Sequence, residues 1–536
     1  MFESSAAAKV MAAGHLALVL HGHLPFVRRL QAGSLQEDWF HQAVLESYLP
    51  LLHHLQRSAE DPRQSPALSL SLSPTLLAML ADPLLCGRFP DWVTCRQRIL
   101  EWAPPQHHHA AAHLSQQLAA MLAFWRQLRG RLIPAFQELQ RQGVLDLLTC
   151  GATHGYLPLL REPRSAVVAQ LQVAVEHHRH HLGCAPLGIW LPECAYFEGL
   201  DRLMAAEGLR YAVLDAHGLL QALPRPRYGI YAPICSPGAV AFVGRDSTAT
   251  LPVWSARDGY PGQACYREFY RDLGWDLPPE QLEEMAIPNA RPLGLKLHAV
   301  GPPSCPLEHK PPYSPEEAKC QVQADAEDYV QGRVRQLRQL QSAMGSQPPL
   351  VVAPFDAELF GHWWYEGPQF LAALWREAPR QQLRFTTLRR CLEDSPQLQL
   401  CRPAPSSWGQ GGYHGYWLNE TNAWAVPLWH RCGLRMERLA ATHGHHKQRK
   451  HLLRQAAREL LLLQSSDWSF ILRSGTTTDL AREQIHRHGE RFQALADALD
   501  SGQAPPPAWL KAVEAEDNLF PDLHLKPWLP APSRPA

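Results

Sequence analysis

LALVLHGHLPF, residues 16–26, decides the fold class, because a short apolar run ends there directly in polar residues. Residues 16–20 have the composition of a strand that is buried on both faces. Similar runs recur between longer amphipathic segments such as 166–181 and 315–343, and predict strands at 16–20, 68–72, 145–150, 187–191, 211–215, 293–299, 350–354 and 383–387. Alternating strands and helices predict an α/β fold with a parallel sheet, and seven or eight strands over this length favour a barrel.

Two segments interrupt this alternation. Residues 85–140 are polar and helical in pattern, which predicts a helical insertion. Beyond about residue 403 the strand pattern ends, and helices are expected at 420–443, 446–464 and 478–499. The predicted units are a catalytic domain over 1–402, an all-α C-terminal domain over 403–525, and a Pro-rich tail over 526–536 that frays.

Composition excludes several classes of protein. The chain has 536 residues, and its 51 Lys+Arg balance 51 Asp+Glu, so no net charge attracts nucleic acid or an anionic membrane. No apolar run reaches the ~18 residues of a transmembrane helix. The N-terminus resembles a signal peptide, but Lys9, Gly14 and His15 interrupt it, which favours a cytoplasmic protein. The 12 cysteines form no Cys-x-x-Cys pair and are expected to be buried thiols in a reducing compartment.

Polar residues follow four of the expected strands. His21 and His23 follow the first strand, His154 lies in GATHGYLP, Glu193 in WLPECAY and Asp356 in PFDAELFGHWWYEGP. Barrel enzymes carry their chemistry at the carboxyl ends of the strands. These side chains are therefore expected to converge in one cleft.

Two carboxylates on separate strands fit glycoside chemistry, in which one attacks the anomeric carbon and the other exchanges a proton with the leaving and entering oxygens. A single carboxylate at a strand end is more often a helix cap or an ion-pair partner. The aromatic residues around Glu193 and Asp356 favour the catalytic interpretation, because indole and phenol faces serve as platforms for sugar rings. They are Trp190, Tyr196, Phe355, Trp363 and Trp364.

The ordered motifs HGHLPF, GATHGYLP, WLPECAY, APFDAELFGHWWYEGPQF and SSDWSFIL resemble those of glycoside hydrolase family 57 over residues 16–490. Together with YREFYRDLGW they look most like its 1,4-α-glucan branching enzymes. The resemblance implies a seven-stranded (β/α) barrel with a helical insertion and a helical C-terminal domain. It also implies an α-glucan substrate, no cofactor and no metal, and the protein is expected to be a monomer or a weak homo-oligomer.

By this resemblance Glu193 matches the family's nucleophile and Asp356 its general acid/base. Further residues match positions that bind glucan or line the sugar subsites: His21, His23, His154, Trp190, Arg267, Trp275, His362, Trp363, Trp408, Trp417 and Asp467.

Two departures from the branching pattern favour hydrolysis. Thr476 stands where the branching enzymes usually carry Gln. Their loop over the site carries a Tyr, but the segment 233–247, which aligns with that loop, contains no Tyr; the nearest one is Tyr231. A lid that excludes water favours transfer over hydrolysis.

The alternatives are a 4-α-glucanotransferase or α-glucan hydrolase, a metal-dependent hydrolase using His21 and His23, and a non-catalytic glucan-binding protein. The histidine runs at 107–109 and 177–181 are expected to be solvated or loosely packed helix faces rather than metal sites.

Overall fold

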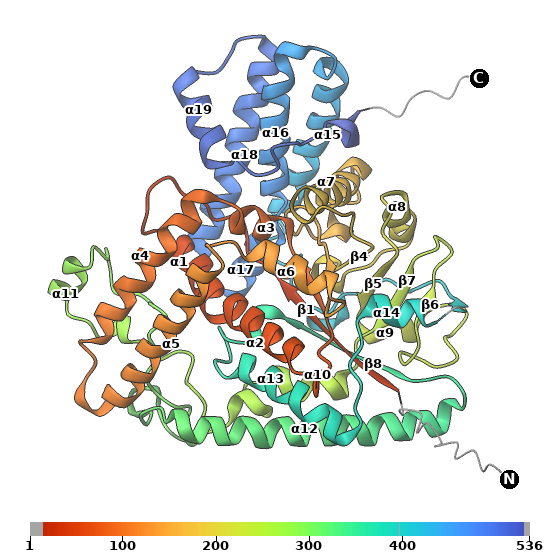
Figure 1. The fold of residues 1–536 in the computed structure, drawn as a ribbon. Coiled ribbons are helices and arrows are strands. Elements are labelled where there is room, and N and C mark those ends of the chain that lie inside the picture. The colour runs from red at the N-terminus through yellow and green to blue at the C-terminus, as the bar shows by residue number, and fades with distance from the viewer. Residues whose placement is uncertain (1–13, 396, 530–536) are drawn as a thin grey trace.

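The computed structural model describes residues 14–395 and 397–529. Most of the segment that resembles a signal peptide, and the tail from residue 530 onward, lie outside the described residues. The chain has an α/β fold with a helical C-terminal region (Figure 1).

Four parallel strands form the first sheet in the order β3-β2-β1-β8. They are β1 (His15–Gly22), β2 (Leu68–Leu72), β3 (Leu145–Leu148) and β8 (Leu350–Asp356). β1 is buried almost throughout, as expected for a central parallel strand that is covered on both faces. Its register with β8 sets His21 opposite Asp356.

The second sheet has the order β4-β5-β7-β6-β9. Its strands are β4 (Gly188–Ile189), β5 (Tyr211–Leu214), β6 (Ile234–Cys235), β7 (Ala241–Gly244) and β9 (Gln399–Leu400). β4, β5 and β7 are parallel, whereas β6 runs antiparallel to β7. Single parallel bridges, Thr149 to Ile189 and Arg245 to Val352, join the two sheets at both edges.

Two predicted strands are not strands. Residues 293–299 have alternating buried leucines, but they meet their neighbours only through isolated bridges. The Asp272 carboxylate instead accepts hydrogen bonds from the backbone N–H groups of Leu293, Gly294 and Leu295, so these donors need no adjacent strand. Residues 383–387 touch β1 through one bridge, from Phe385 to Leu16.

Helices surround the sheets. Before β8 they are α1 (Leu35–Ala43), α2 (Leu49–Glu60), α3 (Pro74–Leu80), α4 (Pro83–Leu100), α5 (His108–Gln127), α6 (Leu132–Arg141), α7 (Arg164–Leu182), α8 (Leu200–Ala206), α9 (Ala216–Leu220), α10 (Ser247–Trp254), α11 (Pro279–Glu284) and α12 (Pro315–Met344). The start of α4 is capped by Asp82, whose carboxylate accepts from the N–H groups of Leu84 and Leu85. In α12, Val322, Ala326 and Val330 form a buried stripe at four-residue spacing.

After β8 the regular structure of the described residues is helical except for the two-residue strand β9. These helices are α13 (Gly367–Glu377), α14 (Leu388–Glu393), α15 (Ala425–His443), α16 (Lys450–Leu463), α17 (Ser466–Ser474), α18 (Thr478–Ser501) and α19 (Pro507–Glu516). In Figure 1, α15, α16, α18 and α19 stand together above the sheets, and α12 runs along the lower side. The tail does not fray from residue 526, because residues 526–528 form a turn of 3-10 helix with Trp528 buried.

The histidine runs are more buried than expected. His177 and His178 on α7 lie in the interior, and burial lowers the pKa of His178 to about 3. His107 is also buried, whereas His109 is exposed and pairs with Glu316. The solvated-face prediction is therefore wrong for these three buried rings. No helix in the described part of the chain has the length and apolar character needed to cross a bilayer.

Candidate active site

The carboxyl ends of β1 and its neighbours carry a compact group of histidines. His21 Nε2 lies 3.0 Å from His154 Nε2, and the rings of His23 and His154 stack at 4.0 Å between centroids. Each ring is oriented through its Nδ1 atom by one serine hydroxyl: Ser71 at 3.2 Å, Ser73 at 2.9 Å and Ser466 at 2.9 Å, for His21, His23 and His154 respectively. Burial, aided by neighbouring histidines, lowers the pKa of His21 and His154 well below the ordinary value. Neutral rings in these positions can exchange hydrogen bonds with neutral hydroxyl groups.

The C-terminal region contributes one carboxylate to this group. Asp467, on α17, lies 3.0 Å from His23 Nε2 and also accepts a hydrogen bond from the Ser465 hydroxyl. Burial alone raises the pKa of Asp467, but the facing His23 outweighs it and brings the value down to about 2. Asp467 is therefore an anion at neutral pH that anchors His23.

The ring geometry bears on the alternative of a metal site. Ligand atoms of His23, His154 and Asp467 all lie within 4.8 Å of one another. A zinc ion binds imidazole nitrogen at about 2.0–2.1 Å, along the lone pair in the plane of the ring. The rings of His23 and His154 are only 12° from parallel, so their lone pairs point side by side and do not converge. This arrangement suits hydrogen bonding rather than metal coordination.

Glu193 follows β4 in an unusual backbone conformation. Its φ of 62° and ψ of 26° lie in the left-handed region, which non-glycine residues seldom adopt outside functional sites. The Trp408 indole Nε1–H donates to Glu193 Oε2 over 2.6 Å, and the Trp408 backbone N–H donates to the Glu193 carbonyl. Burial is the largest influence and raises the pKa of Glu193 to about 8, while the indole hydrogen bond acts in the opposite direction.

Asp356 is the last residue of β8 and lies close to a second carboxyl group. Burial raises the pKa of Asp356 to about 7, against the attraction of His23 and Arg245. Two residues later, Glu358 accepts hydrogen bonds from the Tyr48 hydroxyl and the His23 backbone N–H. Burial raises the pKa of Glu358 to about 8. Sequence reasoning missed Glu358, although the run DAEL, with a second acid on the same motif, signalled it.

Aromatic side chains line one side of the carboxylates. Trp190 is buried and stacks on His21 at 4.8 Å, with Trp408 edge-on to it at 5.0 Å. Trp254, at the end of α10, lies 5.9 Å from Trp408 and 6.4 Å from Trp363, ring to ring. Trp363 is half exposed, so the cluster extends from the interior to the surface.

Arg267 and His362 form a separate buried network through Glu46. The guanidinium of Arg267 donates to Glu46 Oε1 over 3.2 Å, and His362 Nδ1 lies 2.6 Å from Glu46 Oε2. Burial tends to raise the pKa of Glu46, but His362, Arg267 and Lys296 outweigh it and bring the value to about 2. Among the described residues, neither Arg267 nor His362 forms a hydrogen bond or ion pair with Glu193 or Asp356. Glu46 was not anticipated from the sequence.

Two predicted glucan-binding tryptophans differ in exposure. Trp275 has 52% of its side chain exposed and lies in a short 3-10 turn. Trp417 is buried, and its ring stacks on Tyr156 at 4.4 Å, so one of its faces is already covered. Thr476 is exposed in the turn after α17, with its hydroxyl 3.3 Å from that of Ser474.

The segment 233–247 is not a loop over the candidate site. It contains β6 and β7. The Tyr231 carbonyl accepts a hydrogen bond from the N–H of Leu350, the first residue of β8, whereas Asp356 is the last residue of that strand. The matching of this segment to a lid is therefore wrong. The residues that follow β7 lie at the carboxyl end instead, and they place Arg245 and Trp254 beside Trp408.

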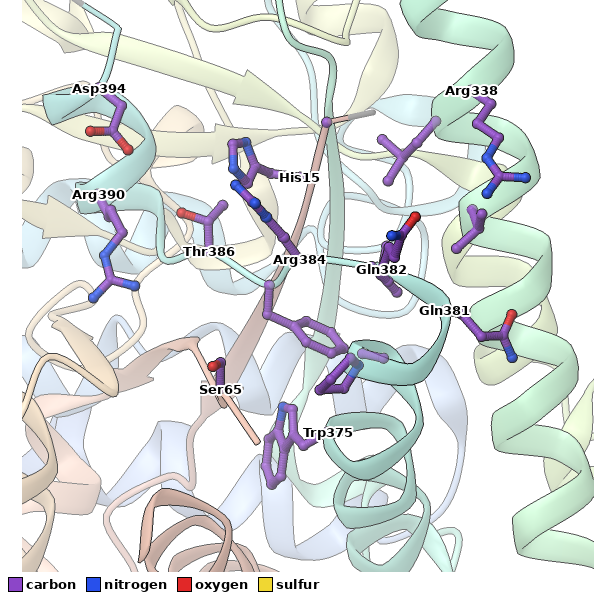
Figure 2. A pocket seen from close by; sticks show the side chains of 17 residues that line it. His15, Ser65, Arg338, Trp375, Gln381, Gln382, Arg384, Thr386, Arg390 and Asp394 are labelled. Carbon is purple, nitrogen blue, oxygen red and sulfur yellow. The ribbon is translucent and has the colours of Figure 1, made fainter. Parts of the chain in front are cut away.

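A cavity of about 540 Å³ lies at the opposite end of β1 (Figure 2). His15, Arg384 and Trp375 line it, together with Arg338 from α12. It shares no residue with the histidine group and does not belong to the candidate active site.

Two family models match the chain. The model for glycosyl hydrolase family 57 matches residues 17–274, which include the histidine group and Glu193. The model for the C-terminal part of 1,4-alpha-glucan branching enzymes matches residues 428–528.

Whole proteins and solved structures are also similar. A probable 1,4-alpha-glucan branching enzyme from Mycobacterium tuberculosis is 31% identical over 522 residues, covering 91% of this chain and 93% of its own length. The alpha-amylase AmyC from Thermotoga maritima superposes with a TM-score of 0.89 at 32% identity, covering 96% of this chain and 99% of its own. A family 57 branching enzyme from Pyrococcus horikoshii superposes with a TM-score of 0.87 at 29% identity, covering 98% of each chain. This chain therefore belongs to glycoside hydrolase family 57.

Proposed function

We propose that this protein is a retaining 1,4-α-glucan branching enzyme with Glu193 as nucleophile and Asp356 as general acid/base. The observation that carries the proposal is the pair of partly buried carboxyl groups at the ends of β4 and β8, both with raised pKa values. The names of the Mycobacterium and Pyrococcus relatives support the reaction. The substrate is an α-1,4-linked glucan.

In the first step a Glu193 carboxylate oxygen attacks C1 of a glucose unit while Asp356 gives its proton to the departing O4. The donor chain is then bound to Glu193 as a glycosyl ester, and the other fragment leaves with a free 4-hydroxyl. In the second step the C6 hydroxyl of another glucose attacks C1, Asp356 accepts its proton, and Glu193 leaves as a carboxylate. Two inversions give an α-1,6 bond with retained configuration.

The reaction requires one proton on the carboxyl pair. Two interacting acids lose their protons in two steps that belong to the pair, and the form with a single proton lies between these steps. That form is productive when the proton is on Asp356. The pKa of Glu193, about 8, exceeds that of Asp356, about 7, so the single proton is more often on Glu193. The indole N–H of Trp408 increases the productive share, because it donates a hydrogen bond that stabilises the Glu193 carboxylate.

The remaining predicted site residues are assigned by their surroundings. His21, His23 and His154 bind sugar hydroxyls next to the reacting bond, and Asp467 orients His23. Trp190, Trp408 and Trp363 belong to the aromatic group beside the carboxylates and contact the glucan there, and Trp275 offers an exposed ring for a further contact. Trp417 is buried and supports the aromatic group from the interior. Arg267 and His362 act as positioning residues through their contacts with Glu46.

We also infer that β1, β2, β3, β4, β5, β7 and β8 close into a (β/α)7 barrel within residues 1–402. The two parallel bridges between the sheets support this closure. The helical region over 403–525 acts as a second domain that completes the site, an assignment supported by the Asp467–His23 contact.

An α-glucan hydrolase is the second candidate. One observation favours it: the strong likeness to the structure of an alpha-amylase. Both candidates use the same carboxyl pair and differ only in whether a sugar or water accepts the glycosyl group.

Incubation with amylose separates these candidates. Proton NMR of the product measures α-1,6 anomeric signals, and a reducing-end assay measures hydrolysis. A branching enzyme generates α-1,6 signals with few new reducing ends. New reducing ends without α-1,6 signals would overturn branching in favour of hydrolysis, and an unchanged glucan would overturn both.

A further inference from the structure

Exposed aromatic rings occur on α17 and on the segment 416–424, which is hydrogen-bonded to α17 through Asn422. Phe470 on α17 and Trp424, at the start of α15, have 43% and 36% of their side chains exposed. Tyr416 is partly exposed and lies 4.7 Å from Phe470, ring to ring. We refer to Tyr416, Trp424 and Phe470 as the aromatic ridge. Exposed apolar side chains that occur singly need no explanation, but a group of large rings on one surface is typical of a binding site.

The ridge is held rigidly by hydrogen bonds beneath it. The side-chain amide of Asn422 is buried and donates to the carbonyls of both Tyr416 and Ser469, over 3.0 and 3.1 Å. This bond ties the segment that bears Tyr416 to the residue before Phe470. The Trp424 indole N–H donates to the Thr421 carbonyl over 3.1 Å, which fixes its ring. Rings that are ordered before binding lose little conformational entropy when a ligand stacks on them.

The ridge is continuous with the candidate active site through two connections. Phe470 lies one helical turn beyond Asp467, whose carboxylate contacts His23. Tyr416 directly precedes Trp417, which stacks on Tyr156, a residue of the same motif as His154. The segments that carry the ridge therefore also carry or contact residues of the candidate active site.

We propose that the aromatic ridge binds a further run of glucose units of an α-glucan chain, outside the histidine and carboxylate cluster. A pyranose ring presents a face of C–H groups that stacks on an aromatic ring and removes apolar area from water. His486 is exposed and stacks on the Trp424 ring at 5.5 Å, so its ring nitrogens lie beside the ridge and offer hydrogen bonds to sugar hydroxyls. This inference rests on the proposed function only in taking an α-glucan as the ligand.

Chain length is the variable that tests the ridge. Long amylose is expected to occupy both the histidine and carboxylate cluster and the aromatic ridge, whereas maltotriose occupies only the histidine and carboxylate cluster. Phe470→Ala and Trp424→Ala are each combined with Glu193→Gln, which prevents turnover, and dissociation constants for both sugars are measured by calorimetry. We expect each ridge variant to bind amylose about tenfold more weakly, equivalent to ~1.4 kcal/mol, with unchanged affinity for maltotriose. Phe470→Tyr retains the flat ring and is expected to retain the affinity.

Tyr228→Ala provides a matched control. Tyr228 is a half-buried aromatic residue under the Arg227 guanidinium, with no contact to the ridge, and its loss is expected to leave both dissociation constants unchanged. Unchanged amylose affinity in both ridge variants would overturn the proposal, as would an equal loss for maltotriose. If the unsubstituted enzyme forms no α-1,6 bonds while Phe470→Ala still weakens amylose binding, branching is wrong and the ridge stands.

Discussion

Trp408→Phe tests the proposed protonation of the carboxyl pair. The substitution keeps an aromatic ring next to Trp190 but removes the indole N–H that donates to Glu193 Oε2 over 2.6 Å. A hydrogen bond to a charged group contributes about 1.5–3 kcal/mol, and one pKa unit corresponds to about 1.36 kcal/mol. The pKa of Glu193 is therefore expected to rise by roughly one to two units above its value of about 8.

The assay is the pH profile of kcat/KM on a short chromogenic maltooligosaccharide. Because the pKa of Glu193, about 8, lies above that of Asp356, about 7, the basic limb of the bell-shaped profile reports Glu193 and moves to higher pH by roughly one to two units, whereas the acid limb, set by Asp356, stays in place. Near neutral pH, kcat/KM falls by about 10- to 100-fold.

Trp417→Phe is the control for this substitution. The Trp417 indole N–H has no hydrogen-bond partner among the described residues, so its removal is expected to leave both limbs in place. If the basic limb of Trp408→Phe also stays in place while glucan affinity is unchanged, the assigned role of the indole is wrong.

Three other outcomes are expected. Glu193→Gln lowers amylose turnover by at least about a thousandfold with an unchanged circular dichroism spectrum, and substantial residual turnover argues against this nucleophile. Glu46→Gln leaves Arg267 buried without its anionic partner and costs about 3–5 kcal/mol in denaturant unfolding at pH 7. The pKa of Glu46 in the folded protein is about 2, below its ordinary 4.5. The difference in unfolding free energy between the two proteins is therefore fully present above about pH 4.5 and vanishes as the pH falls through 2. A difference that does not depend on pH contradicts the ion-pair explanation. Dialysis against a chelator leaves the rate unchanged, since the rings of His23 and His154 do not converge on a metal, and a loss restored by zinc would refute that reasoning.

Several strands and the histidine group were predictable because their signals are local. The runs that became β1 and β8 are almost continuously apolar, the run that became β2 alternates leucine with serine, and each is followed or ended by polar residues at the edge where the site lies. Residues 293–299 have the same alternation of leucines, yet Asp272, about twenty residues earlier, satisfies their backbone donors. A side chain that replaces a neighbouring strand leaves no local signal, so this error follows from tertiary structure.

The short strand β7 was missed for a related reason. Ala241–Gly244 is only four residues long and follows a glycine- and proline-containing turn, so its sequence resembles a loop. Its pairing with β5 makes it a strand, and that pairing carries the following segment to the carboxyl end of the sheet. The network around Glu46 was equally invisible, because its partners Arg267 and His362 lie 221 and 316 residues away in the sequence.

The contact between His23 and Asp467 has a consequence for biosynthesis. The two residues are 444 positions apart, and at roughly 5–20 residues per second a ribosome needs about 20–90 s to travel from one codon to the other. A nascent chain holds the first histidines long before α17 exists to anchor them. The complete site therefore forms only after α17 has been synthesised, and a nascent chain that stops short of α17 lacks the carboxylate that anchors His23.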